Sequence, residues 1–111
     1  MNAPTHIRIR HGLRRLELEY EDGSALALPA EFLRVHYPVP PGTTAPLIAG
    51  KRLVGIRAAE PTGNYALRLR FSDGFETGVY SWTYLRDLGR EYRIRWRRYL
   101  HRLEQAGLSR E

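Results

Sequence analysis

The sequence predicts an α+β domain, in which a twisted antiparallel sheet of about five or six strands is built on two Asp-Gly hairpins. Two short helices and an amphipathic C-terminal helix are expected to pack on that sheet. The first observation is that apolar and polar residues alternate in several short runs, which is the period of a half-buried strand. The second is that the apolar spacing becomes helical near the end of the chain. The 111 residues suffice for one domain, 1–111.

Alternating strands occupy the first part of the chain. Apolar residues alternate with arginines at 7–9 and with glutamates at 16–20. The Asp-Gly pair at 22–23 tolerates the positive φ of a tight turn, so we expect a hairpin over 14–28. Pro29 has the fixed φ that suits the first position of a helix, and a short helix is expected to follow the second strand.

A proline-rich loop and a second hairpin are predicted next. Residues 36–50 hold four of the seven prolines, which excludes a helix or a central strand there. Apolar residues in 51–58 indicate a buried strand, and 60–64 is a predicted turn. The second alternation, over 65–79, contains an Asp-Gly pair and predicts another hairpin.

Two helices are predicted after this hairpin. Ser81 is a candidate N-cap for a helix over 82–88, and Gly89 is expected to end that helix. The last helix should span about 90–106, with one apolar stripe facing the sheet. The stripe consists of Tyr92, Trp96, Tyr99, Leu100 and Leu103. Large side chains expected to anchor the core are Phe71, Trp82, Trp96 and Tyr99.

Composition argues against several kinds of catalytic or metal site. There is no cysteine, which excludes a disulfide, a thiolate nucleophile or a cysteine zinc site within the chain. The four histidines lack metal-ligand spacing, and no serine lies in a Gly-x-Ser-x-Gly turn. No glycine-rich phosphate loop occurs. We therefore predict no catalytic residue, no metal, no cofactor and no enzymatic activity.

No long apolar run indicates a signal peptide or a membrane segment, and we expect a cytoplasmic protein.

Arginine on the last helix is the polar feature that most favours a binding role. The formal net charge is +6, and 86–102 contains seven arginines and two acidic residues, which gives +5 for that segment. An apolar side chain ringed by arginines is typical of a protein-binding hot spot. The candidate partner surface joins Tyr37 of the proline-rich loop to the arginine side of the helix, and its members are Arg90, Arg93, Ile94, Arg97, Arg98, His101 and Tyr37. A solvated face and a nucleic-acid surface are the alternatives.

Three runs of the chain, 16–34, 60–74 and 77–89, resemble the gamma-butyrobetaine-hydroxylase-like N-terminal domain family, a former domain of unknown function. The first and second runs carry Asp-Gly turns, and the third reads Thr-Gly-Val-Tyr-Ser-Trp-Thr-Tyr-Leu-Arg-Asp-Leu-Gly. The C-terminal helix is similar to that of small bacterial stand-alone members. Domains of this family also occur at the front of gamma-butyrobetaine and trimethyllysine hydroxylases and as appendages of P-loop ATPases that carry iron–sulfur clusters.

The resemblance implies a fold and an association with oxygenase or iron–sulfur systems. In the hydroxylases it implies a structural zinc held by cysteines and one histidine, whereas this chain has no cysteine in its loop and Phe75 where the family's turn often has histidine. We therefore expect a non-catalytic accessory or protein-interaction module with an unidentified protein partner. The first alternative is a basic nucleic-acid-binding domain that uses the arginine-rich helix. The second is a metal-binding domain like the zinc-bearing members.

Overall fold

A computed structural model describes residues 3–111 and confirms the α+β class. In chain order the elements are β1 (His6–Arg10), a 3-10 turn η1 (His11–Leu13), β2 (Arg15–Glu19), β3 (Ala25–Pro29), α1 (Ala30–Val35), β4 (Ile56–Thr62), β5 (Ala66–Phe71), β6 (Gly78–Ser81), α2 (Trp82–Arg90) and α3 (Tyr92–Gln105). In the part of the chain that is described, no helix is long and apolar enough to cross a membrane.

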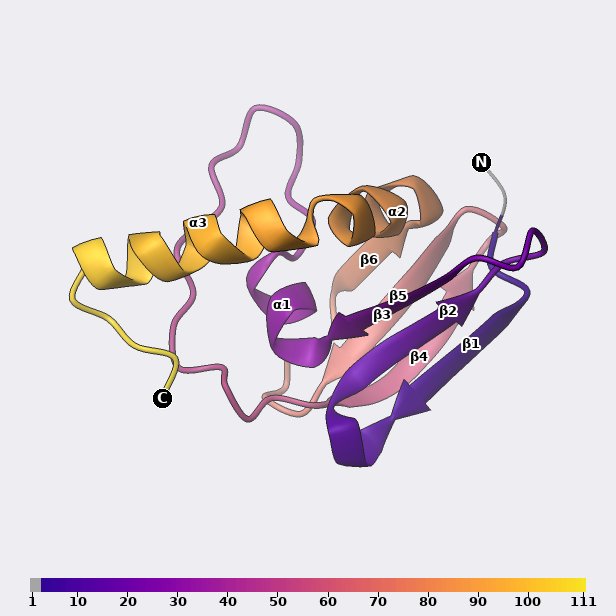
Figure 1. Cartoon of the computed structure of the whole chain (residues 1–111), viewed down its shortest axis with the longest axis horizontal. Helices are drawn as coiled ribbons and strands as arrows, with labels where there is room; N and C mark the ends of the chain where they lie inside the picture. The colour runs from indigo at the N-terminus through magenta and orange to yellow at the C-terminus, as the bar shows by residue number, and fades with distance from the viewer. Residues whose placement is uncertain (1–2) are drawn as a thin grey trace.

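The six strands form two antiparallel sheets of three strands each, ordered β1-β2-β3 and β4-β5-β6. The single sheet of about five or six strands that we expected is therefore wrong in its strand count, because each sheet has three strands. Figure 1 shows one sheet in front of the other, and a single core cluster draws buried residues from both, including Leu16 and Leu18 of β2 and Leu67 and Leu69 of β5. Alternation places these leucines on the inner face of each sheet, so sheet-to-sheet packing forms the main core.

Both predicted Asp-Gly turns are present. Asp22 accepts a hydrogen bond from the Ser24 N–H at 2.9 Å, and Asp73 accepts one from the Phe75 N–H at 3.1 Å. The glycine after each aspartate has a φ near +90°, at +87° for Gly23 and +92° for the second. A residue with a Cβ is strained in that conformation, which explains the Asp-Gly pairs in physical terms.

The strands of the second sheet differ in extent from the sequence-based expectation. β4 begins at Ile56 and continues to Thr62, so Leu53 lies outside it and is 68% exposed. β6 begins only at Gly78, and Tyr80 rather than Val79 faces the core. A Cβ on Gly78 would lie 2.8 Å from the Tyr80 ring, so the close approach of this ring requires glycine.

The α2 helix confirms one expectation and corrects another. Ser81 caps α2 as predicted, because its hydroxyl accepts the Tyr84 N–H at 3.0 Å. Gly89, however, lies inside α2 and does not end it. A Cβ at that position would be 2.7 Å from a methyl group of Leu26, so glycine permits α2 to approach β3. Its role is close packing between a helix and a strand.

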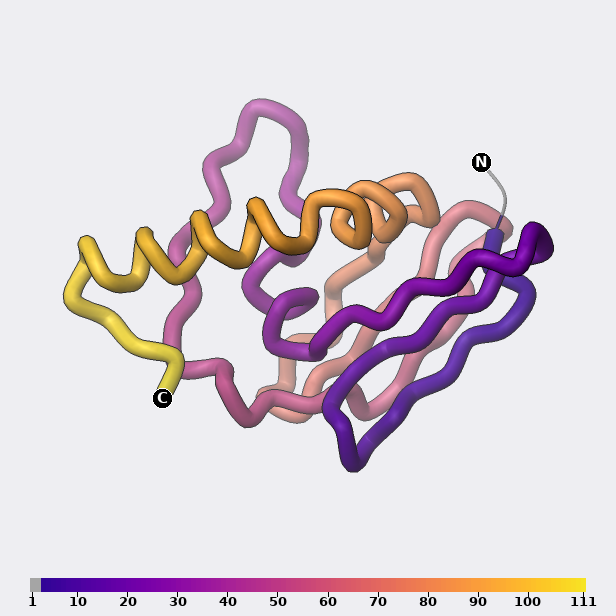
Figure 2. The backbone as a smooth tube through the Cα atoms, in the orientation of Figure 1, coloured from indigo at the N-terminus to yellow at the C-terminus, as the bar shows by residue number. Residues whose placement is uncertain are grey.

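The α3 helix packs mainly on α1 and the proline-rich loop, where we had expected the sheet. Tyr99 and Leu103 are buried against Val35 and the loop residues 47–49. The Tyr92 ring lies edge-on to Phe32 of α1 at 4.7 Å between centroids. In Figure 2, α3 runs beside α1 with the loop rising behind it. Of the expected stripe, Leu100 is 38% exposed and is not part of this second core.

The chain after α3 returns to residues 50–52, ahead of β4, and connects to α1. Backbone hydrogen bonds join Gly50 N–H to the Ser109 carbonyl and Arg52 N–H to the Arg110 carbonyl, both at 3.0 Å. Arg110 also donates two hydrogen bonds to Glu31 of α1, at 2.9 and 2.7 Å. The last residues thereby fix the far end of the proline-rich loop.

Candidate functional site

The predicted partner surface divides into two parts. Arg93, Ile94, Arg97, Arg98 and His101 are exposed on α3, as expected. Arg90 lies at the end of α2 and forms an ion pair with Asp87. Tyr37 lies on the other side of α3, within a cavity that the loop forms. The structure therefore brings most of the predicted residues together on α3 but separates Tyr37 from Ile94.

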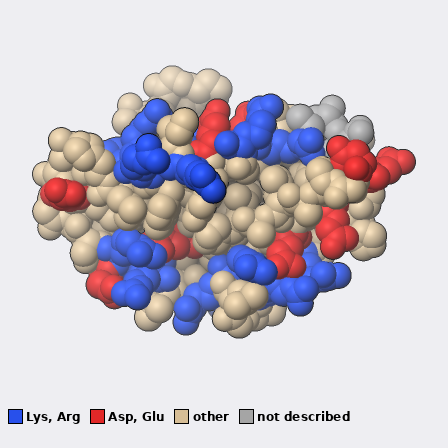
Figure 3. Space-filling view, viewed as in Figure 1, with Lys and Arg blue, Asp and Glu red and all other residues tan. Residues whose placement is uncertain are grey.

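The outer α3 face, defined here as Arg93, Ile94, Arg97, Arg98 and His101, is basic with an apolar centre. The Ile94 side chain is 56% exposed, and the last four residues of the set border a shallow hollow. Within residues 3–111, no carboxylate pairs with Arg93 or Arg97, although Arg90 and Arg95 on neighbouring turns are paired. Figure 3 shows basic side chains gathered over α3.

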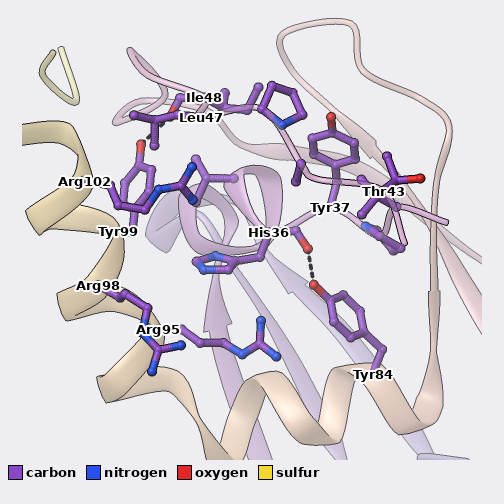
Figure 4. A pocket seen from close by; sticks show the side chains of 15 residues that line it. His36, Tyr37, Thr43, Leu47, Ile48, Tyr84, Arg95, Arg98, Tyr99 and Arg102 are labelled. Atoms are coloured by element: carbon purple, nitrogen blue, oxygen red, sulfur yellow. Dashed lines mark hydrogen bonds between the residues drawn. The ribbon is translucent and has the colours of Figure 1, made fainter. Parts of the chain in front are cut away.

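A cavity of about 440 Å³ lies on the opposite side of α3, between this helix, the end of α1 and the proline-rich loop. Figure 4 shows that Arg95, Arg98 and Arg102 approach it from α3, while Leu47 and Ile48 border it from the loop. The three arginines are spaced at i, i+3 and i+7 and therefore share one side of the helix.

Only one of these three arginines has an acidic partner in the described chain. Arg95 forms an ion pair with Glu91 at 2.7 Å, and its side chain is 28% exposed. Arg98 and Arg102 form no ion pair within residues 3–111, and the cavity lining contains no carboxylate. The cavity wall that α3 provides therefore carries uncompensated positive charge.

His36 lies at the centre of this arrangement. Its Nδ1 is 2.9 Å from the Phe32 carbonyl oxygen, and its ring contacts the Phe32 ring at 4.4 Å between centroids. Burial lowers the pKa of His36, and the positive charges of Arg95 and Arg102 lower it further. The imidazole is therefore held neutral near pH 7.

Two tyrosines hold the loop in place around the cavity. The Tyr84 hydroxyl donates to the His36 carbonyl oxygen at 2.6 Å, and the Tyr99 hydroxyl donates to the Ile48 carbonyl oxygen at 2.7 Å. Burial raises the pKa of both phenols, so they remain protonated donors at neutral pH. These bonds fix the two ends of a loop that has no regular secondary structure of its own.

A charged cluster lies next to Tyr37, outside the cavity lining. Asp73 accepts a hydrogen bond from Arg34 at 2.8 Å and pairs with Lys51 at 2.7 Å. Burial alone would raise the pKa of the Asp73 carboxyl, but hydrogen bonds from Lys51, the Phe75 N–H and Arg34 outweigh that effect and lower the pKa. The Asp73 carboxylate is thus committed to binding two cations.

Phe75, where the family's turn often has histidine, lies in this cluster. Its ring is 4.2 Å from the Arg34 guanidinium carbon and 5.1 Å from the Tyr37 ring centroid. The part of the chain that is described contains no group of three or more His, Asp or Glu side chains placed to hold a metal ion. Elemental analysis of the purified protein is the direct test of the metal-binding alternative.

His36, Asp73 and the serines at 72 and 81 do not form a catalytic triad in the described chain. His36 bonds to a backbone carbonyl, and Asp73 bonds to two cations. Ser72 accepts the Gly55 N–H at 2.8 Å, and Ser81 caps α2. Each of these groups therefore has a structural partner of its own.

Sequence reasoning did not identify the cavity. Arg95 and Arg102, which line it, were not among the predicted surface residues. The available signal was their spacing of seven residues, together with a loop that has apolar and hydroxyl residues but no acidic ones between 35 and 49. That signal becomes meaningful only once α3 is known to pack beside this loop.

Comparison with known proteins identifies relatives of the whole chain. Residues 7–86 match the family model described as gamma-butyrobetaine hydroxylase-like, N-terminal. One NMR solution structure shares 39% sequence identity with this chain at a TM-score of 0.88. The match covers 100% of this chain and 91% of the chain in that structure. A second NMR solution structure shares 38% sequence identity at a TM-score of 0.89, and the match covers 100% of this chain and 86% of the chain in that structure.

A crystal structure gives a third comparison. It is a protein from Acidithiobacillus ferrooxidans ATCC 23270, described as having unknown function and as belonging to the DUF971 family. It shares 38% sequence identity with this chain at a TM-score of 0.69, and the match covers 78% of this chain and 91% of the chain in the crystal structure. No curated protein matches the chain.

Proposed function

The chain belongs to the gamma-butyrobetaine hydroxylase-like N-terminal family, and we propose that it is a non-catalytic accessory module that binds an acidic surface of a protein partner through the outer α3 face. The observation that carries the proposal is the exposed Ile94 side chain between Arg93 and Arg97, neither of which has an ion-pair partner in the described chain. We place the module in the cytoplasm and, on the family resemblance, in oxygenase or iron–sulfur systems.

The chemistry of this face suits a protein partner. Arginine and large apolar residues are enriched in binding hot spots, where an apolar anchor is surrounded by polar contacts that exclude water. The unpaired guanidinium groups lose no internal ion pair when they meet carboxylates, so their desolvation is offset by new charge-assisted hydrogen bonds. An acidic partner with a small apolar recess for Ile94 fits these properties.

The nucleic-acid alternative receives less support from this face. Proteins that bind single strands usually present aromatic rings on which bases stack. The aromatic residues of α3 are turned the other way: Tyr99 is 4% exposed, and Tyr92 and Trp96 pack against Phe32. What the outer α3 face offers to an anionic strand is charge alone.

Quantitative affinity capture from the native cell tests the proposal. The test variant carries Ile94→Glu and Arg97→Glu, and the matched control is Arg57→Glu, which reverses an exposed charge on β4. We expect the test variant to lose acidic proteins that the wild type and the control both retain. Equal protein sets for all three would refute the surface assignment.

A salt titration with a single-stranded oligonucleotide separates the two classes of partner. A nucleic-acid site would lose affinity linearly in log salt, and the slope would flatten on loss of Arg97. We expect no such binding at low salt. A steep slope that depends on Arg97 would favour the nucleic-acid alternative over the protein partner.

A further inference from the structure

The cavity between α3 and the proline-rich loop has properties that the outer α3 face does not need. Its volume of about 440 Å³ lies within the range of small-molecule sites, which is roughly 300–1,000 Å³. Binding of a protein surface to Ile94 and Arg97 does not involve it, because those side chains lie on the other side of the helix. The cavity therefore requires an explanation of its own.

One wall of the cavity is strongly basic. Arg98 and Arg102 approach it from successive turns of α3, and no carboxylate of residues 3–111 pairs with either. Arg95, on the turn before, forms an ion pair with Glu91. The loop opposite has no acidic residue between positions 35 and 49. Two guanidinium groups are thus free to bind oxyanions, which they match in planar, bidentate geometry.

The opposite wall is largely apolar. Val35, Pro46, Leu47 and Ile48 border the cavity there. Ligand sites commonly combine such an apolar lining with a few polar groups that fix orientation. This composition favours an organic molecule with an apolar body over a bare inorganic ion.

Further polar groups are available at the rim. Tyr37 and Thr43 border the cavity, and their hydroxyl groups form no hydrogen bond within the described chain. Tyr84 and Tyr99, by contrast, use their hydroxyls to hold the loop. Two tyrosine hydroxyls thus hold the loop through backbone carbonyls, while the hydroxyls of Tyr37 and Thr43 remain free for a ligand.

We propose that this cavity binds a small organic molecule that carries two negative charges on an apolar body, with the charged end on Arg98 and Arg102 and the apolar end against Leu47 and Ile48. A phosphomonoester and a dicarboxylate share this chemistry. The site shares Arg98 with the outer α3 face, but its other lining residues are distinct from that face, and it would add a small-molecule ligand to the proposed protein contact.

The electrostatic field inside the cavity is consistent with an anionic ligand. Arg95 and Arg102 of α3 act together on the imidazole of His36 and lower its pKa beyond the effect of burial. The other polar groups around this ring are the Phe32 carbonyl, the Tyr84 hydroxyl on the His36 carbonyl, and the Tyr99 ring at 6.2 Å. None of these is an anion, so a bound anion would raise the pKa of His36.

Isothermal titration calorimetry of the whole chain at low salt tests the proposal, with phenyl phosphate and benzylsuccinate as probes. We expect saturable binding of at least one probe, and comparison of the two distinguishes a phosphate from a carboxylate preference. Benzyl alcohol, which has no charge, and inorganic phosphate, which has no apolar body, are both expected to bind at least tenfold more weakly. Absence of saturation by either probe up to about 10 mM would overturn the proposal.

Variants locate the binding. Arg102→Gln removes a cavity guanidinium from an exposed position and is expected to reduce affinity about tenfold or more, as loss of one charge-assisted hydrogen bond does. Arg97→Gln is the matched control on the outer α3 face and should leave affinity unchanged. Equal losses in both variants would show nonspecific attraction to a basic helix and would refute the site.

NMR titration of the His36 ring gives a readout that does not depend on affinity. Saturation with the binding probe should raise the pKa of His36 in the wild type, while the ring signals of His101 on the outer α3 face should keep their chemical shifts. An unchanged His36 pKa at saturation would place the ligand elsewhere and overturn the assignment. Thermal unfolding of each variant confirms that it is folded before these comparisons are made.

Discussion

Arg110→Ala should destabilise the fold by about 2 kcal/mol, because it leaves the carboxylate of Glu31 buried without its partner. Glu31 is 6% exposed and receives two hydrogen bonds from Arg110, at 2.9 and 2.7 Å. Removing one partner of a fully buried ion pair costs about 3–5 kcal/mol. The Arg110 side chain is 39% exposed, which allows water to solvate part of the site in the variant and reduces the cost. Loss of its contact with the Trp96 ring, at 5.2 Å, adds to the destabilisation.

Urea unfolding followed by tryptophan fluorescence measures this free energy, and the expected change corresponds to a fall in Tm of roughly 8 °C for a chain of this size. Arg52→Ala is the matched control, since it breaks an ion pair with Glu111 that also holds the C-terminal segment but is exposed on both sides. Its effect should stay below about 0.5 kcal/mol. In a Glu31→Gln background, where no buried charge remains, Arg110→Ala should lower the free energy of unfolding by less than about 1 kcal/mol. Equal effects of Arg110→Ala and Arg52→Ala would refute the argument from burial.

Three further changes test the packing and the charge state of the core. Tyr80→Phe leaves the buried Leu33 carbonyl without its donor and should cost about 1–2 kcal/mol in urea unfolding. Gly89→Ala should destabilise the wild type by about 1 kcal/mol through contact with Leu26, and should stabilise a Leu26→Ala background, where helix propensity alone remains. The lowered pKa of His36 means that the unfolded chain binds a proton more readily than the folded chain, so stability should decline as pH falls below 6.5. His36→Gln should remove that part of the decline, and an unchanged pH profile would contradict it.

Local rules predicted the two hairpins and the start of α2. The Asp-Gly turns depend on positive φ and on a side-chain hydrogen bond from the aspartate, and Ser81 caps a helix that begins at the next residue. These interactions span only two or three residues, so they are visible in the sequence. The interpretation of Gly89 as a helix end failed because its neighbour Leu26 is distant along the chain.

The residues that surround α3 could not be predicted from local sequence patterns, because they too are distant along the chain. The helical spacing correctly identified Tyr99 and Leu103 as buried, but it did not reveal what covers them. Their neighbours come from a loop without periodicity, held by hydrogen bonds such as that between Tyr99 and the Ile48 carbonyl. The cavity exists only because of these long-range contacts, and its basic wall was therefore not recognised from the sequence.

The packing of α3 explains how one helix can present two separate basic surfaces. Burial of Tyr99 and Leu103 fixes the rotation of the helix, which turns Arg97 outward and Arg102 toward the loop. Arg97 therefore belongs only to the proposed protein contact and Arg102 only to the proposed ligand site. Arg98 borders both the hollow and the cavity, so variants at this position would not distinguish the two. Because the decisive substitutions are made at Arg97 and Arg102, failure of either proposal leaves the other open to its own test.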